Sequence, residues 1–136
     1  MEIFDGRTAT LSMLDKNILL VTMKENAVVD VADTIENYEV AIRLASGNRY
    51  VSLVDARAFA TITDEAKKHA AQPDMYEHVI AQAIVITSLA TRLMANFLIQ
   101  FHKKNKDVEM KLFNDYDKAL NWLKEKLLEE QVDATR

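Results

Sequence analysis

Ser88 and Arg92 have the residue types and the spacing that could bind an anion. Ser88 follows an apolar run at residues 83–87 that is typical of a strand, and Arg92 lies about one helical turn further on. Backbone N–H groups at a helix start attract anions, and open α/β sheets bind ligands beyond the carboxyl ends of their strands. The sequence has no glycine-rich loop here to admit a phosphate. We therefore favour Ser88 as the N-cap of the following helix.

Asp55 and Arg57 form a charged pair at the end of another predicted strand, residues 50–54. Their charges could pair with each other or contact a partner protein. An exposed ion pair contributes little to stability and is common on protein surfaces. A structural pair at the surface is therefore the interpretation that we favour.

Catalytic and metal-binding patterns are missing from the sequence. His69, His78 and His102 lie on three separate segments without metal-ligand spacing, and the chain has no cysteine. Glu65 and His69 share a helix face, but a surface ion pair explains them better than a zinc site. Nucleophile elbows, P-loops and dinucleotide fingerprints are also absent. We expect no catalytic residue, no metal and no cofactor.

The charge and hydropathy of the chain limit its partners. With 21 acidic and 17 basic residues and a net charge of −4, it lacks the basic footprint of nucleic-acid binding. No apolar stretch reaches the ~18 residues of a transmembrane helix, and residues 1–6 lack the blocks of a signal peptide. The absence of cysteine fits a reducing compartment. These patterns predict a cytoplasmic protein with no transmembrane segment and no nucleic-acid partner.

Alternating strand and helix patterns predict how these residues are positioned. An opening hairpin followed by strands that alternate with helices favours parallel pairing with right-handed crossovers. Asp30 and Asp33 have the spacing of a reciprocal helix N-cap. The predicted strands are 8–14, 18–23, 50–54, 83–87 and 108–113, and the predicted helices begin at 31, 64, 89 and 116. We expect one α/β domain over residues 1–128, with a five-stranded mixed sheet and four main helices, and a frayed tail at 129–136.

The helix predicted over residues 89–101 carries more apolar surface than one sheet face usually covers. Its polar stripe is narrow and consists of Arg92, Asn96, Gln100 and Lys103. Its apolar side chains include Met94, Phe97, Leu98 and Phe101. Methionine and aromatic residues suit both subunit interfaces and ligand pockets. Three interpretations are open: the same chain covers this surface, a second subunit covers it, or it lines a pocket for an apolar ligand.

Six phrases carry a family resemblance through their order and spacing, and the resemblance covers the chain from about residue 11 to residue 127. They are VADTI at 31–35, LVDAR at 53–57, ITDEA at 62–66, AIV at 83–85 followed by Ser88, LMANFL at 93–98, and LFND at 112–115 leading to ALNWL at 119–123. Together they resemble small bacterial STAS-like domains. Those domains are related in fold to the sporulation anti-anti-sigma proteins and, more distantly, to the CRAL-TRIO lipid-binding domains.

The resemblance implies a regulatory role without the usual switch. Its better-known members are phosphorylated on a serine directly after the aspartate that ends the third strand, but here Ala56 follows Asp55. We therefore expect no phospho-acceptor, and a non-enzymatic regulatory or scaffolding module that acts through protein contacts. The expected partners are a second copy of the chain, in a homodimer, and a regulatory protein.

The alternative function is binding or carriage of a small apolar ligand or lipid near the helix at 89–101. Either function assigns the same helix to the site. The residues expected to form the interface or bind the ligand are Arg92, Met94, Phe97, Leu98 and Phe101. Those expected to make polar or partner contacts are Asp55, Arg57, Ser88 and Asn96.

Overall fold

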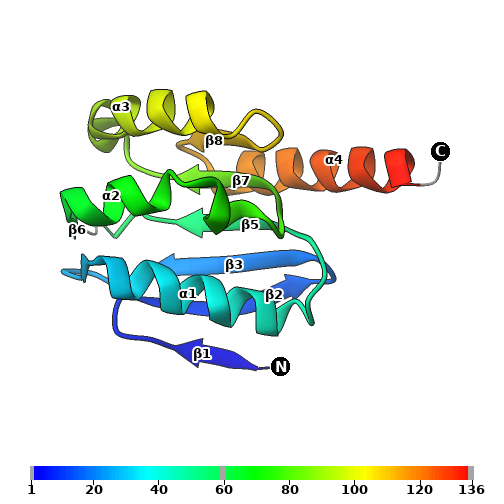
Figure 1. The fold of residues 1–136 in the computed structure, drawn as a ribbon, viewed down its shortest axis with the longest axis horizontal. Helices are drawn as coiled ribbons and strands as arrows, with labels where there is room; N and C mark the ends of the chain where they lie inside the picture. The colour runs from blue at the N-terminus through cyan, green and yellow to red at the C-terminus, as the bar shows by residue number, and fades with distance from the viewer. Residues whose placement is uncertain (1, 59–60, 135–136) are drawn as a thin grey trace.

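The described part of the chain folds around a six-stranded sheet (Figure 1). The computed structural model describes residues 2–58 and 61–134, and for residues 88, 89 and 91–93 it describes the backbone alone. The strand order across the sheet is β1-β2-β3-β5-β7-β8. Its strands are β1 (Ile3–Asp5), β2 (Ala9–Asp15), β3 (Ile18–Met23), β5 (Tyr50–Asp55), β7 (Val79–Val85) and β8 (Glu109–Phe113).

The pairing of these strands is mixed, as the sequence predicts. β1, β2 and β3 pair antiparallel, whereas β3, β5, β7 and β8 pair parallel. Asn17 supplies the positive φ, 64°, that the tight turn between β2 and β3 requires. A separate ribbon forms where β4 (Val28–Val29) pairs parallel with β6 (Thr61–Ile62).

The prediction of five strands is wrong because it omits β1. This strand has three residues, too few to show an alternating pattern, and its pairing with β2 stabilises it. Gly6 makes the turn between them, and its N–H donates to the Ala9 carbonyl at 2.9 Å. A Cβ at Gly6 would lie 2.5 Å from the Phe4 ring and 3.1 Å from the Ala9 carbonyl oxygen, so a larger residue here would require the Phe4 ring to move.

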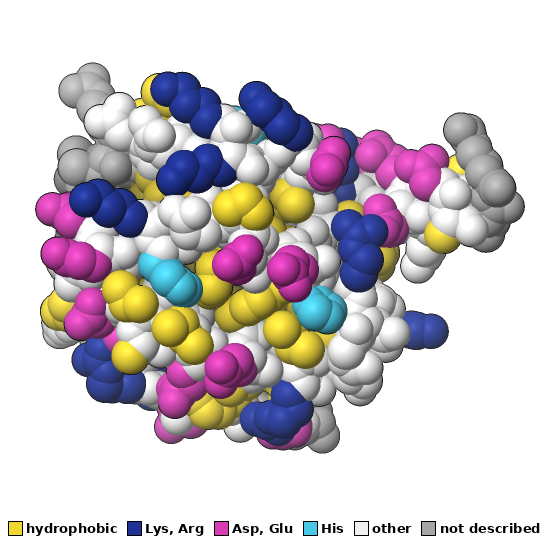
Figure 2. All heavy atoms as spheres, in the orientation of Figure 1, with side chains coloured by type: hydrophobic (Ala, Val, Ile, Leu, Met, Phe, Trp, Pro, Cys, Tyr) yellow, Lys and Arg dark blue, Asp and Glu magenta, His cyan; other side chains and the backbone are white. Residues whose placement is uncertain are grey.

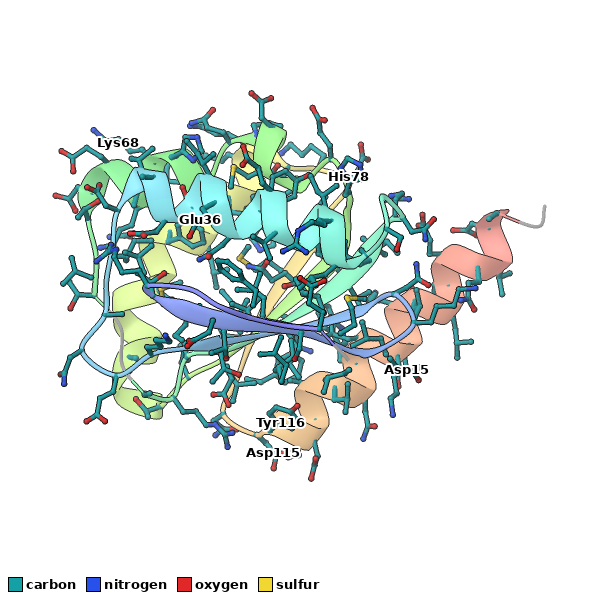
Figure 3. All side chains as sticks on the ribbon, turned by 90° about the horizontal axis from the view of Figure 1, so that it is seen from below. Asp15, Glu36, Lys68, His78, Asp115 and Tyr116 are labelled. Atoms are coloured by element: carbon teal, nitrogen blue, oxygen red, sulfur yellow. The ribbon has the colours of Figure 1, made fainter. Side chains whose placement is uncertain are left out.

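Four α-helices cover the sheet unequally (Figures 1 and 3). They are α1 (Val31–Leu44), α2 (Asp64–Ala70), α3 (Ser88–Lys104) and α4 (Tyr116–Ala134), and a 3₁₀ turn, η1 (Pro73–Tyr76), follows α2. Helices α1, α2 and α3 lie on one face, and α4 lies on the other. In Figure 3, Glu36 on α1 and Tyr116 on α4 are on opposite sides of the sheet.

Two element boundaries differ by four residues or more from those predicted. β7 begins at Val79 rather than at residue 83, because the polar Gln82 interrupts an otherwise apolar run. α4 continues to Ala134, beyond the predicted start of a frayed tail at residue 129. The extension consists mainly of good helix formers, and Glu130 forms an ion pair with Arg49 of the body of the domain.

A charged network fixes the start of α1. Asp30 and Asp33 form the predicted reciprocal cap, and the Asp33 carboxylate accepts from the Asp30 N–H at 2.9 Å. Arg7 donates to Asp33 through Nε at 3.1 Å and also through a second guanidinium nitrogen. The hydrogen bonds from Arg7 are the largest of the effects that hold the pKa of Asp33 below its ordinary value.

The Asp33→Asn substitution is expected to lower the free energy of unfolding at pH 7 by about 1–3 kcal/mol, through the lost charged hydrogen bonds and cap. Because the pKa of Asp33 is lower in the folded state, its stabilisation is complete above the unfolded pKa of about 4 and is lost as pH falls through the folded value. Urea titrations at pH 7 and about pH 3 measure this. The difference from wild type should shrink in acid, and an equal loss at both values contradicts the assignment. The exposed Glu39→Gln is the control.

Candidate functional site

The carboxyl half of α3 packs against its own chain. Phe101 is completely buried, and its ring meets that of Tyr76 edge to face with centroids 4.8 Å apart. Asn105, at the end of the helix, donates from its side chain to the carbonyls of Ala71 and Phe101, both at 3.0 Å. Leu98 packs against the same core. Of the predicted interface residues, Phe101 is therefore covered within the subunit, whereas Leu98 is half-buried against the same core.

An apolar cavity lies between the sheet and the three helices on this face. Its inner lobe has a volume of about 220 Å³. Alternation along the strands points Leu19 and Val21 of β3 and Val54 of β5 into it. Helix α1 contributes Ala41 to the opposite wall, and α3 contributes Phe97.

A second lobe of about 300 Å³ adjoins the first on the side of Ala56. Ala56 and Ala90 line this outer lobe, together with Lys67 of α2. The residues that line both lobes are Met23, Val29, Val54, Ile62, Ile84 and Met94. The two lobes are therefore adjacent, and these shared residues form the boundary between them beneath α3.

Two polar contacts join α1 to neighbouring segments beside the inner lobe. The Thr34 hydroxyl donates to the Val31 carbonyl at 2.7 Å and lies 3.0 Å from Nδ1 of His69 on α2. The Tyr38 hydroxyl accepts from the backbone N–H of His78 at 3.1 Å. Figure 2 shows apolar side chains reaching the surface in this region, with histidine beside them. Thr34 and Tyr38 also line the inner lobe, so the cavity extends to the contacts that α1 makes with His69 and His78.

Polar side chains also face the inner lobe from the sheet itself. They are Tyr50 and Ser52 of β5 and Gln82 of β7. Tyr50 and Ser52 are 2% and 3% exposed, and Ser52 pairs in register with Gln82. Burial raises the pKa of the Tyr50 hydroxyl, which is therefore protonated at neutral pH.

These three residues are missing from the sequence-based prediction of the site. Each lies within an apolar run, and a buried strand can hold a polar residue for structural reasons alone. Their spacing in β5 could have indicated the site. Tyr50 and Ser52 are two residues apart, so both side chains, each with a hydroxyl, lie on the same face of the sheet. The sequence alone does not reveal the space in front of them.

Asp55 and Arg57 form the predicted pair. Arg57 donates to the Asp55 carboxylate at 2.9 Å from Nε and at 2.8 Å from a terminal nitrogen. These bonds are the largest of the effects that hold the pKa of Asp55 below its ordinary value, and the guanidinium also lies 5.5 Å from the centre of the Tyr116 ring. Because both charges are satisfied locally, the geometry agrees with a structural pair.

The predicted anion site lies at the first turn of α3, and the structure describes only part of it. The N-cap is Thr87 and Ser88 is the first helical residue, so the prediction of Ser88 as the cap is wrong by one position. The backbone at Thr87 has the extended geometry of a cap. The side chains of Ser88 and Arg92 lie outside the described residues. Asn96 is exposed on the outer surface of the helix.

Within residues 2–58 and 61–134, no cluster of three metal-ligating side chains is present. A search of the same residues finds no helix with the length and hydropathy needed to span a membrane. The polar side chains that line the inner lobe carry hydroxyl and amide groups, and Lys67 lines the outer lobe.

The comparisons with known proteins identify a family without an assigned activity. No curated protein and no solved structure matches the chain significantly. The family model described as a domain of unknown function, DUF7793, matches residues 12–127. This span runs from within β2 into α4 and includes the cavity-lining residues with the exception of Leu11. The chain therefore belongs to the DUF7793 family.

Proposed function

We propose that this domain binds a small, largely apolar ligand in the cavity beneath α3. The observation that carries the proposal is the pair of adjoining lobes, of about 220 and 300 Å³, with largely apolar walls. A well-packed interior has few voids larger than a water molecule. An engineered apolar cavity of roughly 150 Å³ binds benzene, so the inner lobe is large enough for a molecule of that size.

The proposal is one of binding and not of catalysis. General acid–base chemistry most often uses a histidine or a carboxylate in contact with the substrate, and less often a lysine or a tyrosine. Among the described residues that line the two lobes, the ionisable side chains are Lys67 and the tyrosines Tyr38, Tyr50 and Tyr76. Tyr76 already donates to the Ala70 carbonyl at 2.6 Å. This set suits recognition of a ligand better than transfer of a proton.

A STAS-like ancestry is also part of the proposal. An antiparallel hairpin followed by parallel strand–helix units supports it. Ala56 lines the outer lobe at the position where phospho-switch relatives carry serine. We infer that ligand binding takes the place of phosphorylation as the input to a cytoplasmic regulatory module.

Thermal denaturation with small apolar probes tests the binding. Toluene, cyclohexane and naphthalene are expected to raise the melting temperature in a saturable way. A probe at 100 times its Kd stabilises the folded state by about 2.7 kcal/mol, which corresponds to roughly 10 °C for a domain of this size. Failure of all three probes at their solubility limits contradicts the proposal.

A second candidate function, protein contact through a homodimer, is favoured by the open part of the sheet. α4 packs against β5, β7 and β8. Ile3 of β1 is 63% exposed on that face and lies in register beside Ser12, which in turn pairs with Leu20. Light scattering at about 100 μM should give the mass of a dimer that Ile3→Asp dissociates. A monomer at that concentration removes this candidate.

A further inference from the structure

The floor of the inner lobe contains polar atoms that the protein itself does not satisfy. Within the described residues, the side chains of Tyr50, Ser52 and Gln82 have no hydrogen-bond partner. Among the described residues, each fully buried side-chain nitrogen or oxygen has a hydrogen-bond partner. Because the polar atoms of these three side chains have none, they must keep some accessible surface. Tyr50 and Ser52 are 2% and 3% exposed and line the lobe, and that surface therefore faces the cavity.

Neighbouring polar groups show the contrast. Tyr38 accepts a hydrogen bond from His78, and Tyr76 donates to the Ala70 carbonyl. The chain therefore satisfies two of the three tyrosine hydroxyls that line the lobe and leaves the Tyr50 hydroxyl open. Burying a hydrogen-bond donor without a partner normally costs free energy. Such groups are therefore rare unless a water molecule or a ligand supplies the missing hydrogen bond.

Strand geometry brings the three open groups together. Ser52 and Gln82 are directly paired on adjacent parallel strands, which lie about 4.8 Å apart. Tyr50 is two residues before Ser52 on the same face of β5. On the other side of Ser52 the paired residue is the apolar Leu19. The result is a small polar patch on an apolar floor.

The chemistry of this patch selects an uncharged group. Hydroxyl and amide side chains both donate and accept hydrogen bonds but carry no charge. The described residues of the inner lobe include no lysine, arginine or histidine, since Lys67 lines only the outer lobe. A carboxylate placed here would be desolvated without a counter-ion, which is strongly unfavourable. An alcohol, ketone or amide meets no such penalty.

We propose that Tyr50, Ser52 and Gln82 bind the single uncharged polar group, an alcohol, ketone or amide, of an otherwise apolar ligand. This inference rests on the proposed ligand-binding function and adds the orientation of the ligand. The polar group enters the inner lobe first, and the apolar remainder extends past Met94 toward the outer lobe. As for any tyrosine whose pKa is ordinary or raised, the Tyr50 hydroxyl keeps its proton at neutral pH and can donate.

Calorimetric titration with toluene, benzyl alcohol and benzoate tests the assignment. The variants are Tyr50→Phe, Ser52→Ala and Gln82→Leu, singly and together, and Ser12→Ala on the opposite face of the sheet is the matched control. The triple variant is expected to bind benzyl alcohol about tenfold more weakly, which is the loss of one to two neutral hydrogen bonds. Toluene affinity should be unchanged or higher, and benzoate should not bind wild type detectably.

The outcomes distinguish the assignment of the polar-group site from the proposed ligand-binding function. Equal affinities of wild type and triple variant for benzyl alcohol, with toluene bound by both, overturn the polar-group assignment and leave the proposed function intact. Binding of neither toluene nor benzyl alcohol by wild type overturns both. If the triple variant does not fold, the isosteric Tyr50→Phe alone decides, because a loss of benzyl alcohol affinity with retained toluene affinity supports the assignment and no loss opposes it.

Discussion

Phe101→Ala is expected to lower the free energy of unfolding by about 3–5 kcal/mol, the usual effect of truncating a fully buried phenylalanine. The ring is completely buried, packs edge to face against Tyr76, and lies in the core shared by α1 and the sheet. Its removal leaves a void beside the cavity that is already present, and the surrounding residues have little means of closing it. Equilibrium urea unfolding measures the change.

Ile99→Ala on the same helix is the control for this substitution. Ile99 is 53% exposed, and its truncation is expected to change stability by less than about 0.5 kcal/mol. If Phe101→Ala is equally mild, or if its effect depends on protein concentration, Phe101 lies at a subunit interface and the packing described for α3 is wrong.

Met94→Trp is expected to abolish the thermal stabilisation by toluene. Met94 lines both lobes, so a larger ring at this position is expected to take up space at their boundary. The affinity for toluene should fall at least about tenfold, a free-energy change of about 1.4 kcal/mol or more. Overpacking a filled core commonly costs about 1–3 kcal/mol, but here the added volume enters an existing space, and we expect a smaller loss of stability.

Ile99→Trp introduces the same side chain on the solvent side of α3 and should leave toluene binding unchanged. Calorimetry on both variants gives the comparison. Retained toluene affinity in Met94→Trp, with the variant folded, places the probe somewhere other than the cavity.

The architecture could be predicted from the sequence because strong local patterns specify most of its elements. The turn around Asn17 and the cap formed by Asp30 and Asp33 are local features, and both occur as predicted. β1 depends on pairing with a distant strand and on the close approach of Gly6 to Phe4, neither of which leaves a periodic pattern.

The sequence predicts the apolar character of α3 but not the contacts that its side chains make. Its excess of apolar residues is real, but a helical wheel does not show which neighbours cover each side. The structure divides the predicted residues, with Phe101 in the core, Leu98 half-buried against it, and Met94 and Phe97 at the cavity. This division depends on the position of η1 and α1, which is a tertiary property.

The polar floor could not be predicted, because it is defined by a missing partner. Ser52 and Gln82 interrupt apolar strands, and such residues often bond to other buried groups. Only the register between β5 and β7, together with the space in front of them, shows that these side chains face a cavity.

Native mass spectrometry of the protein, purified without detergent from the cells that produce it naturally, tests the central claim most directly. We predict one small molecule bound per chain, released on denaturation and missing from the Met94→Trp variant but retained by Ile99→Trp. A native mass equal to that of the chain alone, with no stabilisation by any apolar probe, would contradict the claim that this cavity is a ligand-binding site.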